Sequence, residues 1–187
     1  ASHDIAYPNL VQHPDVIDAM MRQPHDDTTR PFKAHRIGPV PLIIAAVDYD
    51  LGRPGLAYVD RVDANYHVAT GGERVEWNDG RTYRNDGVDI AREPDGTPYV
   101  TAFEGREWMQ YTIESDRGGA RGVELTVAAD ASAAIRLSVN GSPESAIAVR
   151  PGAWHEEVAR LGLQRGANRL RIRVERGSVR LKTIRFR

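Results

Sequence analysis

The chain has 187 residues, of which 41% are hydrophobic and 27% are charged, and its formal net charge is −1. A chain of this length fits one domain with an extension, and the near-zero net charge argues against nucleic acid as a main partner. The lack of cysteine excludes disulfides and thiolate metal sites, and no apolar run approaches the length that spans a membrane.

The N-terminal region is rich in proline and histidine and has no signal-peptide pattern, so we expect either a mature chain or a piece of a longer one. Residues 14–23 predict one short helix, because Pro14 suits a first helical position and Pro24 ends it. Its apolar stripe must pack on protein and consists of Val16, Ile17, Met20 and Met21. Residues 24–41, with four prolines, predict an extended linker.

From Leu42 onward, short segments alternate between apolar and polar residues, which is typical of half-buried strands. Turn residues separate them, as in Glu93–Pro98 and in Asn140-Gly141, a strong hairpin signal. The spacing predicts an all-β sandwich of two antiparallel sheets. The predicted strands are residues 42–47, 107–113, 122–129, 134–139, 146–149, 154–163, 169–175 and 179–186, and a long ordered loop is predicted for residues 51–82, which contain Tyr58, Tyr66 and Trp77.

Six short motifs, in order along the chain, carry a family resemblance. They are Ala46-Val-Asp-Tyr-Asp50, Tyr83-Arg-Asn-Asp-Gly-Val-Asp-Ile90, Gly105-Arg-Glu-Trp-Met-Gln-Tyr111, Val139-Asn-Gly141, Gly152-Ala-Trp154 and Gly166-Ala-Asn-Arg-Leu170. Residues 39–187 therefore resemble carbohydrate-binding module family 6, a jelly-roll β-sandwich found beside glycoside hydrolase catalytic domains such as those of family 5. Residues 1–38 lie outside the match and are expected to be a short helix plus linker, such as the tail of a catalytic domain.

The resemblance implies a sugar site at one end of the sandwich. There the family sandwiches a sugar ring between two aromatic side chains and adds an asparagine. Trp154 falls on the second aromatic. The family's first aromatic position corresponds to a place near Ala102, so Phe103 or Tyr99 is the expected opposing ring. The family's asparagine position corresponds to Arg180. The alternative is that Trp154 packs over the sandwich end and that Arg180 is solvated or ion-paired.

The resemblance also bears on metals and catalysis. The family's calcium site uses two glutamates where this chain has Ala45 and Val47, so we expect that site to be lost and no cofactor to bind. Two catalytic alternatives are less favoured than turn and surface roles: a glycosidase carboxylate pair and a loop metal site. Their candidate residues are Glu93, Asp95, Glu104 and Glu107 for the pair, and Asp60, Asp63 and His67 for the metal.

Together these features predict a non-catalytic carbohydrate-binding module that targets a glycoside hydrolase to a plant-type polysaccharide such as β-glucan or xylan. Its expected partners are the polysaccharide or an oligosaccharide and a catalytic domain in the same polypeptide or complex, with neither nucleic acid nor membrane. Binding should be weak because the family cleft is partly lost, and the expected location is secreted or periplasmic. The alternative is a structural sandwich that packs on and stabilises a catalytic domain without binding sugar.

Overall fold

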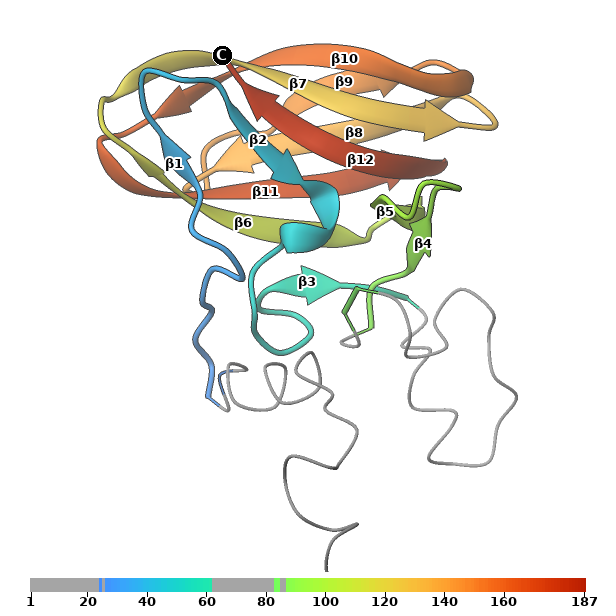
Figure 1. Ribbon diagram of the computed structural model, residues 1–187, viewed down its shortest axis with the longest axis horizontal. Coiled ribbons are helices and arrows are strands. Elements are labelled where there is room, and N and C mark those ends of the chain that lie inside the picture. Colours follow the sequence, from blue (N-terminus) through green and yellow to red (C-terminus); the bar gives the residue numbers. More distant parts are fainter. Residues whose placement is uncertain (1–23, 25, 62–82, 85–86) are drawn as a thin grey trace, which may run out of the picture.

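The computed structural model describes residues 24, 26–61, 83–84 and 87–187. Two six-stranded sheets face one another (Figure 1), which confirms the predicted β-sandwich. The predicted helix of residues 14–23 lies outside the described residues, as do Tyr66 and Trp77 of the long loop. Among the residues that are described, no helix is long and apolar enough to cross a bilayer.

The first sheet has the strand order β1-β6-β11-β8-β9, and β3 also pairs with β6. All of its pairs are antiparallel except β1 with β6, which is parallel. Its strands are β1 (Arg36–Ile37), β3 (Tyr58–Val59), β6 (Trp108–Ser115), β8 (Ala133–Val139), β9 (Ser145–Val149) and β11 (Gly166–Arg176).

The second sheet has the order β10-β7-β12-β5-β4, and β2 also pairs with β12. Every pair in it is antiparallel. Its strands are β2 (Leu42–Ala45), β4 (Ile90–Arg92), β5 (Pro98–Glu104), β7 (Gly119–Ala129), β10 (Gly152–Leu163) and β12 (Ser178–Phe186). A 3-10 turn at Ala46–Asp48 follows β2, so this strand ends two residues earlier than its apolar run predicted.

Alternation along the strands explains the two layers. In β11, the fully buried Leu170, Ile172 and Val174 alternate with more exposed neighbours, as the sequence predicts for a strand with one core-facing side. The β8–β9 hairpin turns at Asn140 and Gly141, whose φ angles of 53° and 75° are left-handed, as the predicted turn requires.

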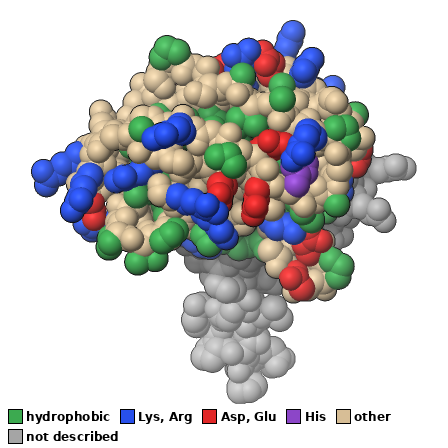
Figure 2. Space-filling view, turned by 90° about the horizontal axis from the view of Figure 1, so that it is seen from above, with side chains coloured by type: hydrophobic (Ala, Val, Ile, Leu, Met, Phe, Trp, Pro, Cys, Tyr) green, Lys and Arg blue, Asp and Glu red, His purple; other side chains and the backbone are tan. Residues whose placement is uncertain are grey.

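The core lies between the sheets and is lined by side chains such as Leu125 and Phe186. The chain after β2 is tied to β6 by buried polar contacts. The Tyr111 hydroxyl donates to the Ala46 carbonyl (2.7 Å), and the Asp50 carboxylate accepts from the backbone and hydroxyl of Thr112 (2.8 and 2.7 Å). Figure 2 shows that both basic and acidic side chains occur across one outer face of the molecule.

The segment predicted as a linker is extended, but part of it belongs to the sandwich. β1 lies within it and pairs with β6, and Arg30 forms a bridge with Leu51. His35 is 6% exposed, and its Nε2 lies 3.3 Å from the Asp48 carbonyl oxygen. The sequence did not predict this pairing because β1 is only two residues long, which is too short to show an alternation of apolar and polar residues.

Candidate functional site

A half-buried tryptophan lies on the second sheet where β10 is irregular. The pairing of β10 with β7 shifts between Gly152 and His155, so Trp154 sits within a β-bulge. Bulges re-aim side chains relative to a regular strand. Trp154 retains exposed surface, as expected for a ring that can contact a ligand.

Tyr99 on β5 packs its ring against Trp154. The ring centroids are 5.2 Å apart and the rings cross at 78°, an edge-to-face arrangement that favours a fixed orientation of both. Tyr99 is half-buried, so this pair forms a partly exposed aromatic surface. The structure thus brings together two of the residues that the sequence singled out.

Lys182 on β12 completes this surface. Its Nζ lies 4.1 Å from the centre of the Trp154 ring. The same atom lies 2.6 Å from Glu93 Oε1 and forms an ion pair with it, although the geometry is not that of a hydrogen bond. Glu93 belongs to the β4–β5 turn, which is closed by its backbone bonds to Gly96 and Thr97. We call Tyr99, Trp154, Lys182 and Glu93 the aromatic platform.

Phe103 is not part of the platform. It is 3% exposed and belongs to the hydrophobic core, which corrects the expectation that its ring could oppose Trp154 across a ligand. The reason is a bulge in β5: Val100 and Phe103 pair with Leu181 and Val179, so β5 has one extra residue there. Ala102 absorbs the irregularity with a φ of 44° and is exposed in the place of the expected ring.

Arg180 is held by an ion pair. Its Nη2 lies 2.8 Å from Asp130 Oδ1, so the alternative of an ion-paired surface arginine describes it in this structure. Sequence reasoning missed Lys182, although it lies two residues further along the same alternating strand and is one of only two lysines. Residues two apart on a strand share a face, and that signal would have directed attention to Lys182.

The acidic residues considered for catalysis have structural contacts. Both oxygens of Glu107 accept backbone hydrogen bonds, from Arg61 (3.0 Å) and Glu104 (2.7 Å), while the Glu104 side chain pairs with Arg61. Burial is the main cause that raises the pKa of Glu107 to about 7. Asp95 accepts from the Thr97 backbone (2.8 Å) within its turn. These contacts organise turns and leave no free pair of carboxylates among these three residues.

Among solved structures, several share this fold. CsCBM6-3 of Clostridium stercorarium, in complex with cellobiose, has a TM-score of 0.56 and 15% identity, and the match covers 82% of this chain and 96% of that one. A family 6 carbohydrate-binding module studied by crystallography and calorimetry has a TM-score of 0.57 and 14% identity, and the match covers 82% of this chain and 97% of that one. The C-terminal family 6 module of the laminarinase LamC from Zobellia galactanivorans has a TM-score of 0.53 and 14% identity, and the match covers 79% of this chain and 98% of that one. The fold is that of a family 6 carbohydrate-binding module.

No family model matches the chain, and no curated protein matches it. At 14–15% identity the family 6 modules share the fold with this chain, and the side chains decide what the fold does here.

The calcium site implied by the family resemblance does not fit these residues. Ala45 and Val47 offer only hydrocarbon where oxygen ligands are needed, and Val47 is fully buried. The nearby Asp48 carboxylate is already engaged by the Tyr83 hydroxyl (2.8 Å) and by Lys33 Nζ (3.2 Å). Within the ranges that the structure describes, no group of three or more histidine or acidic side chains is placed to hold a metal ion.

Proposed function

We propose that this chain is a carbohydrate-binding module and that its sugar contact is the aromatic platform. The observation that carries the proposal is the half-exposed Trp154 ring, held edge-to-face by Tyr99 and in contact with the Lys182 ammonium. A sugar ring has an apolar face that stacks on an aromatic ring, and its hydroxyls then need charged or polar groups at the rim. Lys182 and Glu93 supply such groups.

The platform favours weak binding. Lys182 lies over the Trp154 ring, Phe103 is in the core, and Ala102 has no ring, so a sugar would stack on one aromatic face only. One buried ring face contributes a few kcal/mol, and association costs offset much of it. We expect dissociation constants from high micromolar to millimolar, roughly −4 to −6 kcal/mol.

The substrate class that we propose is a plant-type polysaccharide, β-glucan or xylan. The Clostridium stercorarium module was solved with cellobiose, and the Zobellia galactanivorans module belongs to a laminarinase, so similar folds are associated with β-glucans. We further propose that the chain is non-catalytic, secreted or periplasmic, and serves a glycoside hydrolase catalytic domain in the same polypeptide or complex. The backbone bonds of Glu107 support a non-catalytic role.

Substitution of the platform tryptophan tests this function. Trp154→Ala should abolish the retardation of the protein in native gels that contain β-glucan or xylan, because the stacking surface is removed. Val158→Ala is the matched control, since Val158 lies on the same strand and is 64% exposed outside the platform. Thermal melts should show that both variants stay folded.

Two results would contradict the proposal: no retardation of the wild-type protein by any glucan or xylan, or equal retardation of Trp154→Ala and wild type. Either result would favour the alternative role, a structural sandwich that stabilises a catalytic domain. The exposed apolar side chains of Ile43 and Val158 are compatible with packing of that kind.

A further inference from the structure

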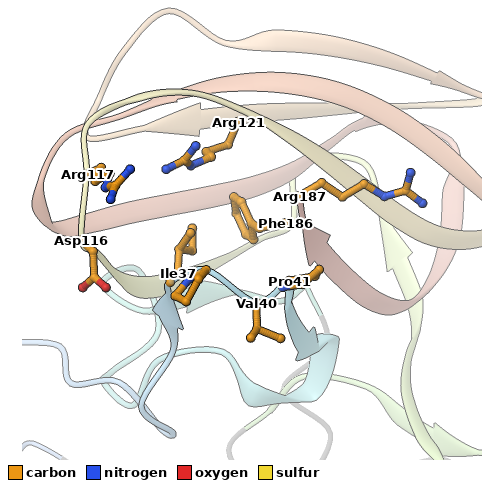
Figure 3. Close-up of a pocket in the computed structure, with 10 residues that line it drawn as sticks. Ile37, Val40, Pro41, Asp116, Arg117, Arg121, Phe186 and Arg187 are labelled. Carbon is orange, nitrogen blue, oxygen red and sulfur yellow. The ribbon is translucent and has the colours of Figure 1, made fainter.

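Figure 3 shows a pocket with a volume of about 430 Å³. It opens beside the start of β7, whereas Trp154 on β10 lies across from the end of β7, at the other end of the second sheet. It is lined by the chain between β1 and β2, by the turn after β6, by the start of β7 and by the end of β12. On β7, Arg121 lines this pocket, whereas Ala128 lies beside Arg180 near the platform. The rise of a strand places these two positions about 20 Å apart.

Arg121 occupies a core-facing position of its strand. It lies on the same face of β7 as the fully buried Val123 and Leu125, and it pairs with Leu161, which is 5% exposed. Its Nε atom is buried and has no hydrogen-bond partner among the described residues. The Arg121 side chain as a whole is half-buried, and leaving its buried Nε–H without an acceptor costs free energy, so packing alone does not account for an arginine here.

Two cations of the pocket remain unpaired after the other charges are assigned. Arg187 pairs with Glu124 (2.7 Å) and Asp116 pairs with Arg36 (2.8 Å), whereas no ion pair is found for Arg117 or Arg121 within the described part of the chain. In Figure 3 the Arg121 side chain points towards Arg117 across the pocket, and the Arg187 side chain points away. Two unpaired guanidinium groups at one end of a pocket attract an anion.

Apart from the paired Asp116 and Arg187, the rest of the pocket is mainly apolar. Phe186 and Ile37 are 1% and 6% exposed, and Val40 with two prolines forms the outer wall. A ligand therefore needs an anionic end and an apolar body. The planar guanidinium fork matches the two oxygens of a carboxylate. A phosphate would bring further oxygens and charge against Asp116 and this apolar wall.

We propose that this pocket binds a small carboxylate-bearing ligand, with the carboxylate between Arg117 and Arg121 and the ligand body against Ile37 and Val40. The pocket shares no residue with the aromatic platform, so the proposal stands whether or not the platform binds sugar. The carboxylate can come from a sugar acid or from an aliphatic acid, because both present the same planar group.

Nuclear magnetic resonance titration of the whole chain tests the proposal. Sodium glucuronate and sodium isobutyrate are the probes, and neutral glucose is the control. We expect saturable shifts of the Nε–H signals of Arg117 and Arg121 with a carboxylate and none with glucose. If glucuronate alone saturates, the ligand is a sugar acid, and if both acids do, the carboxylate alone is recognised; both outcomes support the site.

Variants separate this site from general charge effects. Arg121→Gln and Arg117→Gln should each weaken carboxylate binding at least about tenfold, and Arg121→Lys should recover only part of it, since an ammonium lacks the fork. Arg117 is exposed on a turn, so its substitution keeps the test valid if the Arg121 variants fail to fold. Arg176→Gln, an exposed arginine at the end of β11, and Trp154→Ala should bind as the wild type does.

The proposal is overturned if neither carboxylate produces a saturable shift. It is also overturned if a folded Arg117→Gln or Arg121→Gln variant binds the carboxylate as tightly as wild type.

Discussion

Asp89 is a buried carboxylate that makes the stability of this fold depend on pH. It is 5% exposed, and its Oδ1 has no hydrogen-bond partner among the described groups. Burial is the main cause that raises its pKa to about 8, and the negative charges of Asp60, Glu107 and Glu104 add to it.

We predict that Asp89→Asn stabilises the protein at pH 8. An unfolded aspartate releases its proton near pH 4, whereas the folded state keeps it up to about pH 8, so stability falls as pH rises between these values. Asparagine removes this fall. It should raise the free energy of unfolding at pH 8 by up to about 5 kcal/mol, since a pKa difference of about four units is worth about 1.4 kcal/mol per unit, with little change at pH 4. Urea unfolding at both pH values measures it.

Glu107→Gln is the informative contrast. Both Glu107 oxygens accept backbone hydrogen bonds, so an amide would place a donor against a donor and should destabilise the protein.

The Asp89 prediction is contradicted if Asp89→Asn is less stable than wild type at pH 8. That result would show that Asp89 has a partner that stabilises its ionised form.

At the scale of elements, the short strand β1 connects the N-terminal segment to the sandwich. The Glu114 backbone donates to the His35 carbonyl (2.8 Å), and Ile37 is buried in the core. This strand covers one side of β6, whose polar groups would otherwise form part of an open sheet edge.

We predict that deletion of residues 1–38 lowers the free energy of unfolding by about 2 kcal/mol through the loss of Ile37 burial and backbone bonds. For a chain of this size that corresponds to a fall in Tm of about 4–8 °C. The control is deletion of residues 1–23 alone, which retains β1 and should leave the Tm closer to that of the full chain. Equal melting temperatures for the 1–38 deletion and the full chain would mean that β1 adds no stability.

The sequence predicted the strands of residues 107–186 well because each has its own alternation between two turns. It failed where the backbone is irregular or the pairing is distant. Phe103 was expected to face a ligand, but the left-handed φ of Ala102 rotates it into the core. No residue pattern shows that an alanine will take a φ of 44°, since this conformation is enforced by the neighbouring strands.

The candidate site was predicted in part. Trp154 and Tyr99 lie together, but their rings touch edge-to-face, whereas the resemblance implied two rings on opposite sides of a sugar. Lys182 was missed, and Arg180 is paired with Asp130. Side chains from β5, β10 and β12 meet there, and their distances depend on three bulges that the sequence does not reveal, one of them at Lys182. The arginine pocket depends in the same way on segments distant in the chain.

At the scale of the whole molecule, the sandwich is held by its apolar core, and we expect its stability to be independent of calcium. Ala45 and Val47 cannot ligate, and Asp48 is paired with Lys33 and Tyr83. We predict that excess chelator leaves the Tm unchanged and that added calcium does not raise it, measured by differential scanning fluorimetry. A fall of many degrees on adding chelator would show that other oxygens bind a cation.

The pairing of β12 has a consequence for synthesis on the ribosome. This strand is bonded to β7 on one side and to β5 and β2 on the other, so the second sheet lacks its centre until residue 186 has been made. The partners β2 (Leu42–Ala45) and β12 (Ser178–Phe186) lie far apart in the sequence, and such long-range pairing is slow to form. Until then the edges of β2, β5 and β7 that later pair with β12 are open, and unpaired strand edges of this kind favour aggregation.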